Sequence, residues 1–130
     1  MKKFLVIFGL FAVIMGIAVW ELVATTRFYR ETVQLLSEVE TSMEAYSEQL
    51  DDPEHIKVLE KLESHWESGR SLIMMFGNHS VVRNAEERIV ALGEFTRQNE
   101  LSDAMVSLRQ AQRYIADVMR DVVPDFINLL

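Results

Sequence analysis

The sequence predicts an all-α protein, in which an N-terminal transmembrane helix continues into an antiparallel, up-down four-helix bundle. Two observations lead to this prediction. The chain begins with an apolar run long enough to enter a membrane, and the later apolar residues recur every three or four positions, as on one face of a helix. No segment shows the period-two alternation that is typical of a half-buried strand. We therefore divide the chain into an anchor, residues 1–24, and a helical bundle with an apolar C-terminal tail, residues 25–130.

The anchor is an uncharged run, residues 4–20, that follows Lys2 and Lys3 and ends in Trp20. Its 17 residues are at the short end for a membrane-spanning helix, and a terminal tryptophan suits the lipid–water interface. We interpret the run as an uncleaved signal anchor that leaves the lysines in the cytoplasm. The expected location is the cell membrane, with a single span and with most of the chain extracytoplasmic.

Two other interpretations of this run were considered. A cleavable signal peptide needs small residues before the cut, and residues 16–18, Gly-Ile-Ala, are a passable match. A core helix of a soluble domain would be apolar on every face, which a domain of this size cannot bury. The orientation rests on the lysine-led pattern alone, because Arg27 and Arg30 beyond the run equal Lys2 and Lys3 in number.

The charge is distributed very unevenly along the chain. All 20 acidic residues and 11 of the 13 basic ones lie in residues 21–130, which gives this part a net charge of −9. An acidic domain lacks the basic footprint that nucleic acid requires, and it would not lie flat on anionic lipid. The chain has no cysteine, so disulfides, thiolate nucleophiles and cysteine-based zinc sites are excluded.

Four apolar stripes at helical spacing predict the four helices of the bundle. They consist of Tyr29, Leu36, Val39, Met43, Tyr46 and Leu50; of Ile56, Leu59, Leu62, Trp66, Ile73 and Phe76; of Val82, Ala85, Ile89, Leu92 and Phe95; and of Leu101, Ala104, Leu108, Ala111, Ile115, Val118 and Val122. Helix-ending or turn-forming residues follow the stripes: Asp51, Asp52 and Pro53, then Gly77 and Asn78, then Asn99, and finally Pro124. Short turns of this kind favour antiparallel neighbours.

The first stripe also allows a different assembly. Because no breaker separates Trp20 from Leu50, the anchor and the first helix are expected to form one rod of about 49 residues, roughly 70 Å long. The stripe on this rod fits heptads, so a coiled-coil homodimer through helix one is the alternative to a core within one chain.

Antiparallel threading predicts which segments meet at the membrane. The second turn, residues 74–79, and the tail, residues 122–130, should both lie at the end of the bundle from which the anchor emerges; we call this end the membrane-proximal pole. Apolar surface gathered at one pole is typical of a partner or membrane contact. The candidate partner-binding residues are Met74, Met75, Phe76, His79, Phe126, Ile127, Leu129 and Leu130. A tail that folds back to plug the bundle is the alternative.

The sequence contains no recognisable catalytic or metal-binding motif. His55, His65 and His79 are too far apart for the usual ligand spacing, and we interpret them as surface or turn histidines. The acidic residues of the second and third helices do not form the Glu-x-x-His pairs of a di-metal bundle, and the chain has neither a Gly-x-Ser-x-Gly elbow nor a phosphate-binding glycine loop. We expect no enzyme activity, cofactor, metal or small-molecule substrate.

Several scattered residues together resemble a known family. They are Trp20 and Glu21 at the end of the anchor, Trp66, Phe76, His79, Glu86, Leu92 and the ending Phe126, Ile127, Asn128, Leu129 and Leu130. They are similar to a family of short single-anchor bacterial membrane proteins that is catalogued only as a domain of unknown function. That family usually has a glutamate two places after the turn histidine, where this chain has Val81. The resemblance implies no activity, substrate or cofactor.

Two functions of different classes fit these features. The first is a membrane-anchored accessory protein that docks on an integral membrane partner through the membrane-proximal pole; the other partner considered is a second copy of the chain, bound through helix one. The alternative is an extracytoplasmic ligand-sensing bundle, which would need a signalling partner because only three residues precede the apolar run.

Overall fold

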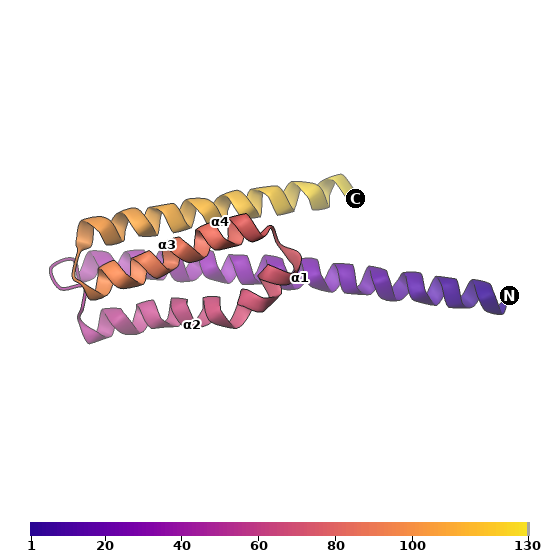
Figure 1. The fold of residues 1–130 in the computed structure, drawn as a ribbon, viewed down its shortest axis with the longest axis horizontal. Coiled ribbons are helices and arrows are strands. Elements are labelled where there is room, and N and C mark those ends of the chain that lie inside the picture. The colour runs from indigo at the N-terminus through magenta and orange to yellow at the C-terminus, as the bar shows by residue number, and fades with distance from the viewer. Residues whose placement is uncertain (130) are drawn as a thin grey trace.

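The chain folds into four helices, α1 (Lys2–Ala45), α2 (Pro53–Phe76), α3 (His79–Arg97) and α4 (Leu101–Leu129), in a computed structural model (Figure 1). The structure describes residues 1–129, except for the side chains of Phe76 and of residues 121–129. No strand occurs among the described residues. The all-α prediction is confirmed.

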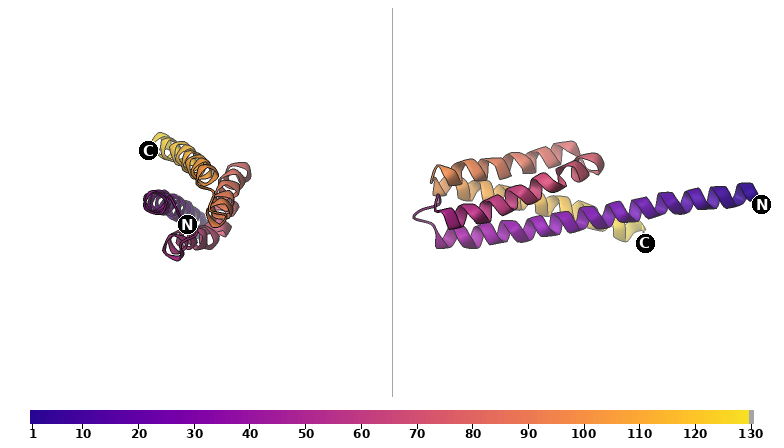
Figure 2. Two further views of the ribbon diagram at one scale, coloured as in Figure 1. Left: turned by 90° about the vertical axis from the view of Figure 1, so that its left-hand side faces the viewer. Right: turned by 90° about the horizontal axis from the view of Figure 1, so that it is seen from below.

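The helices form an antiparallel ring in which each helix contacts its neighbours in sequence and α4 closes back on α1. The end-on view in Figure 2 shows this order, and within the described part of the chain neither diagonal pair of helices makes comparable contact. The predicted up-down bundle is therefore correct. The core is formed by buried apolar residues of the four helices and of the α1–α2 turn, which lie between Phe28 and Ile115 in the sequence.

The first helix is one continuous rod of 44 residues, about 66 Å long. Its N-terminal half projects from the bundle (Figure 1), and it is long and apolar enough to cross a membrane. None of its most apolar stretch is buried in the protein, which argues against the core helix of a soluble domain. Burial against the other helices begins at Phe28.

The first helix ends earlier than the apolar stripe predicts. It stops at Ala45, and Tyr46 and Leu50 lie in the turn that leads to α2. Leu50 is nevertheless fully buried, and its backbone amide donates a hydrogen bond to Asn99 Oδ1 (2.8 Å). Leu50 continues the apolar spacing of α1 because it is buried at the end of the core. The turn after α1 places it there, so no further helix is needed.

The predicted stripes form most of the core. Trp66 is only 3% exposed, as expected for an interior position of α2. Phe28 and Leu35 are buried although they were absent from the predicted stripe. The other buried apolar residues include Tyr29, Leu36, Val39, Met43, Leu59, Leu62, Ile73, Val82, Ala85, Ile89, Leu92, Ala104, Leu108, Ala111 and Ile115.

Polar side chains define the helix ends. Asp52 caps α2 by accepting a hydrogen bond from the amide of Glu54 (2.9 Å), and Pro53 occupies the first helical position, where its missing N–H has no cost. Asn78 caps α3 in the same way. Asn99 ends α3, as predicted, with a left-handed φ of 57°. The amide of Glu100 then reaches back to the carbonyl of residue 95 (2.9 Å), the bond of a Schellman motif.

The prediction that Pro124 breaks the fourth helix is wrong. The helix runs through this residue to Leu129. A proline supplies a φ close to the helical value and removes a single backbone donor, here the one facing the carbonyl of Arg120. The helix is consequently longer than expected at the membrane-proximal pole.

Candidate docking site

The position of the α2–α3 turn along the bundle axis, which we call its level, follows from the contact between Phe28 and Gly69. Gly69 of α2 lies so close to Phe28 that a β-carbon on this glycine would overlap the ring. Because α1 and α2 are antiparallel, the seven residues from Gly69 to Phe76 match the seven from Phe28 back to Glu21, roughly 10 Å along the axis. The turn therefore lies near the level of Glu21, the first residue after the uncharged run.

The level of the end of α4 follows from the contacts of Glu40. This carboxylate of α1 pairs with Arg109 (3.0 Å) and accepts a hydrogen bond from Gln112 (3.0 Å). Nineteen residues separate Glu40 from Glu21, and the same number carries antiparallel α4 from Arg109 to residue 128. The last turn of α4 therefore reaches the level of Glu21 as well.

The C-terminal part of α4 extends beyond α3. Arg88 of α3 donates a hydrogen bond to Gln110 of α4 (3.0 Å), which sets the register of this pair. Counting from that contact, the start of α3 at His79 is level with residue 119 of α4. About ten residues of α4 thus project past α3 along α1, and Figure 1 shows the C-terminal end beyond the α2–α3 turn.

The structure brings the backbones of the two predicted segments to the same pole. Met74 is half-buried against the core, Met75 is 72% exposed, and His79 is exposed at the start of α3. The side chains of Phe76, Phe126, Ile127 and Leu129, and all of Leu130, lie outside the described residues. A binding role for these eight residues stays a prediction.

An aromatic cluster that the sequence did not reveal ties α1 to α2 above this pole. The Phe28 ring stacks on the imidazole of His65, with centroids 4.6 Å apart and planes 13° from parallel, and lies 5.7 Å from Trp66. Gly69 leaves room for the same ring one helical turn further along α2. Burial raises the pKa of neighbouring Tyr29 to about 12. The only signal in the sequence was the four-residue spacing of His65 and Gly69, which shows nothing of Phe28.

The hydrogen bonds around His65 determine which of its nitrogens carries a proton. Thr32 donates its hydroxyl proton to the carbonyl of Phe28 (2.8 Å), so the hydroxyl oxygen of Thr32 must accept from His65 Nε2 (2.9 Å). The Nε2 atom is therefore the protonated one in the neutral ring. The other nitrogen, Nδ1, faces the carboxylate of Glu31 at 3.8 Å. His65 is thus a partly buried tie between helices, not the surface histidine that was predicted.

The prediction of a surface or turn position is also wrong for His55. This side chain is fully buried, and its Nδ1 atom lies 2.7 Å from the hydroxyl of Ser42. Burial lowers the pKa of His55, and the charge of Asp52 partly opposes that shift. The Nε2 atom has no hydrogen-bond partner among the described residues. The side chain fills the end of the core, although the predicted core consisted only of the apolar stripes.

The Ser42–His55 pair lacks the other parts of a catalytic site. Acyl transfer needs a group that orients the base and donors that stabilise an oxyanion. The second nitrogen of His55 lacks such a partner in the described structure, and Ser42 lies inside α1, where backbone amides are engaged in the helix. No group of three potential metal ligands occurs among the described residues either. The pair links α1 to α2.

Comparisons with known proteins found no matching family model, no matching curated protein and no matching solved structure.

Proposed function

We propose that this chain is a membrane-anchored, non-enzymatic accessory protein that docks on an integral membrane partner through its membrane-proximal pole. The observation that carries the proposal is the meeting of three features at one end of the bundle. The α2–α3 turn lies near the level of Glu21, directly after the apolar run of α1, and the last turn of α4 extends to this level past the turn. A partner embedded in the same bilayer would meet this pole first.

The exposed surface at the pole supports this proposal. Among the side chains that the structure describes, Met75 is the most exposed large apolar one outside the N-terminal run. Methionine is flexible and polarisable, which suits a contact that must adapt to a partner. The projecting end of α4 has an apolar sequence, and α3 does not extend far enough to cover it.

In this proposal the lysines lie in the cytoplasm, the anchor is retained and the bundle is extracytoplasmic. Membership of the family of short single-anchor proteins and the ligand-sensing alternative stay predictions. A sensor would bind a small molecule in the bundle, and thermal-shift measurements with metals and small ligands would reveal such binding.

Quantitative co-purification tests the proposal. The full-length protein would be isolated from membranes in mild detergent, as the parent, as Met75→Gln and as Val106→Gln. Val106 is a matched control, since it is an apolar residue 53% exposed near the opposite end of the bundle. We expect the Met75→Gln variant to lose an integral membrane protein that the parent and the Val106→Gln variant retain. Equal recovery from all three would contradict docking through the pole.

A further inference from the structure

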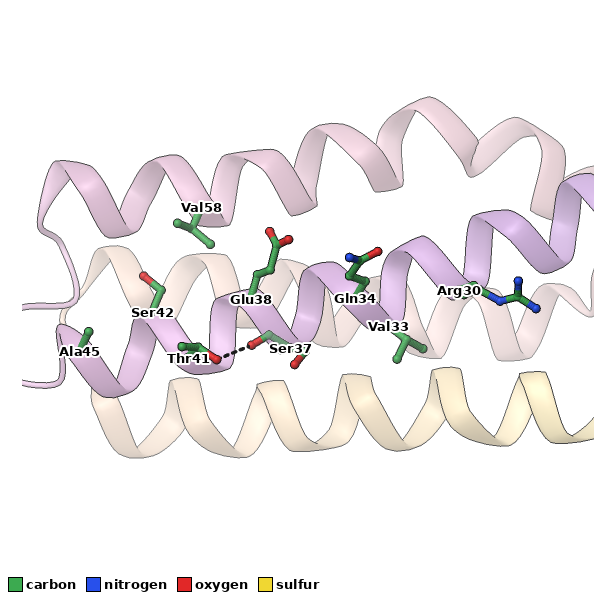
Figure 3. A pocket seen from close by; sticks show the side chains of 9 residues that line it. All are labelled: Arg30, Val33, Gln34, Ser37, Glu38, Thr41, Ser42, Ala45 and Val58. Carbon is green, nitrogen blue, oxygen red and sulfur yellow. Dashed lines mark hydrogen bonds between the residues drawn. The ribbon is translucent and has the colours of Figure 1, made fainter.

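A shallow groove runs along the outer face of α1, away from the core. Figure 3 shows its lining: Arg30, Val33, Gln34, Ser37, Glu38, Thr41, Ser42 and Ala45 of α1, with Val58 of α2 on one side. From Arg30 to Ala45 it covers about 22 Å of helix, or four turns. Its length matches one helix lying alongside α1.

The floor of the groove is a row of small side chains. Val33, Ser37, Thr41 and Ala45 follow one another at four-residue spacing, the spacing of the ridges and grooves by which helices interlock. Thr41 donates its hydroxyl proton to the carbonyl of Ser37 (3.2 Å), so its polar group is already bonded within the helix. Val33 is 41% exposed. The row therefore offers a close, largely apolar approach to another helix.

The same face continues into the membrane-spanning part of α1. Eighteen residues make about five full turns, so positions 18 apart point in one direction. Ala12 lies below Arg30 and Gly16 lies below Gln34, beside the row, whereas Met15 and Val19 lie below Val33 and Ser37 of the row itself. Small residues spaced in this way let transmembrane helices approach closely. A partner helix beside the anchor would thus meet the groove when it leaves the bilayer.

The charges of the groove favour a helix of a different protein over a second copy of this chain. Glu38 pairs with Lys61 of α2 (3.5 Å). Arg30 has no ion-pair partner among the side chains that the structure describes, and Figure 3 shows its guanidinium extended along α1. A second copy anchored in the same membrane would lie parallel to α1 and would place its own Arg30 against this one. Like charges in such a self-complementary contact disfavour the homodimer.

We infer that the groove holds a helix of a different integral membrane protein, which rises from the bilayer parallel to α1 and presents a carboxylate to Arg30. This inference rests on the proposed function and adds a second surface to it, distinct from the pole.

Site-specific cross-linking in native membranes tests the inference. The chain has no cysteine, so an apolar photoreactive probe can be attached at Ser37→Cys in the groove, at Met75→Cys at the pole, where the probe keeps the position apolar as glutamine would not, and at Ser64→Cys on the outer face of α2. Ser64 is an exposed serine like Ser37 and serves as the matched control. We expect the probes at 37 and 75 to label one membrane protein that the probe at 64 does not label.

The groove is specifically supported if the adduct from position 37 maps to a segment flanking a transmembrane helix of that protein. Its yield should fall on the order of tenfold with Arg30→Glu, the change expected for one interfacial charge pair, and persist with Arg30→Lys. Adduct formation at position 75 in the Arg30→Glu background, together with an unchanged melting curve, shows that the variant is folded and still docked.

Five outcomes would overturn the inference. An adduct of two copies of this chain would assign the groove to a homodimer, and an adduct with lipid alone would assign it to the bilayer. An adduct at position 37 that is insensitive to Arg30→Glu would remove the charge contact. Labelling from position 75 but not from 37 would reject the groove and leave the proposed function standing, whereas no labelling from either would reject both.

Discussion

The ring of Phe28 lies against the α-carbon of Gly69, and this contact sets the register of α1 and α2. His65 and Trp66 confine the ring from the other sides.

Replacing Gly69 by alanine should destabilise the bundle. The new β-carbon would overlap a ring that cannot move without disturbing His65 and Trp66, so we expect a loss of about 1–3 kcal/mol, larger than the gain of about 1 kcal/mol from helix propensity. Unfolding of the full-length protein in mild detergent measures the change. Gly93→Ala is the control, since its β-carbon would meet only the ends of the Glu63 and Arg97 side chains, at 2.8 and 2.9 Å. Equal stability of the two variants would contradict the prediction.

Truncating Trp66 should be more damaging than altering its polarity. The side chain is 3% exposed, so Trp66→Ala should cost about 3 to 5 kcal/mol. Its indole N–H has no hydrogen-bond partner among the described residues, so Trp66→Phe should cost clearly less. Thermal unfolding compares the two. An alanine variant that melts within about a degree or two of the parent would place Trp66 outside the core.

Two substitutions of Asn99 separate its backbone role from its side-chain role. Asn99→Gly keeps the left-handed φ at no steric cost but removes the acceptor for the Leu50 amide, which should cost about 1 kcal/mol. Asn99→Ala loses the acceptor and also strains the backbone, so we expect about 1–2 kcal/mol more. Denaturant midpoints should therefore fall in the order parent, glycine, alanine. An alanine variant as stable as the glycine variant would show that the turn relaxes.

His55 should make the stability depend on pH. Because burial lowers its pKa below the ordinary value of 6.5, the unfolded chain takes up a proton before the folded chain does. The contribution of the neutral ring is complete above about pH 6.5 and is lost as the pH falls below that value. The free energy of unfolding, measured at about pH 8 and about pH 5, should fall less in His55→Gln than in the parent. His79→Gln changes an exposed histidine and should preserve the parental difference; an unchanged slope in the His55→Gln variant would contradict the prediction.

Deletion of residues 125–130 should spare the fold and remove the partner. Residues 125–129 of α4 lie past the start of α3, which therefore does not cover them (Figure 1). If the tail plugged the core, its loss would cost several kcal/mol, at about 1.5–3 for each large buried side chain. The test is to measure denaturation and co-purification of the membrane-anchored protein that lacks only residues 125–130. A large loss of stability with the partner retained would show that the tail serves folding.

The features that depend on local spacing could be predicted from the amino-acid sequence. The four stripes predicted four helices and most of the core, including Trp66, because burial on one face of a helix imposes a period of three to four residues. Asn99 marked the end of α3, because asparagine tolerates a left-handed φ. The uncharged run marked a helix able to span a membrane. Each of these signals lies within one segment of the chain.

Which segments meet, and at what position along the bundle axis, depends on how the helices pack against one another. Leu50 had helical spacing but is buried by a turn, and α4 continued through Pro124 where a local rule predicted an end. His55 and His65 are polar residues that a stripe rule assigns to the surface, yet Ser42 and Thr32 on the neighbouring helix provide their hydrogen-bond partners. Such pairings depend on the register of neighbouring helices, that is, on their relative position along the bundle axis. That register is set by the size and shape of side chains far apart in the sequence. The ring of Phe28 on α1, which fits against Gly69 on α2, is an example.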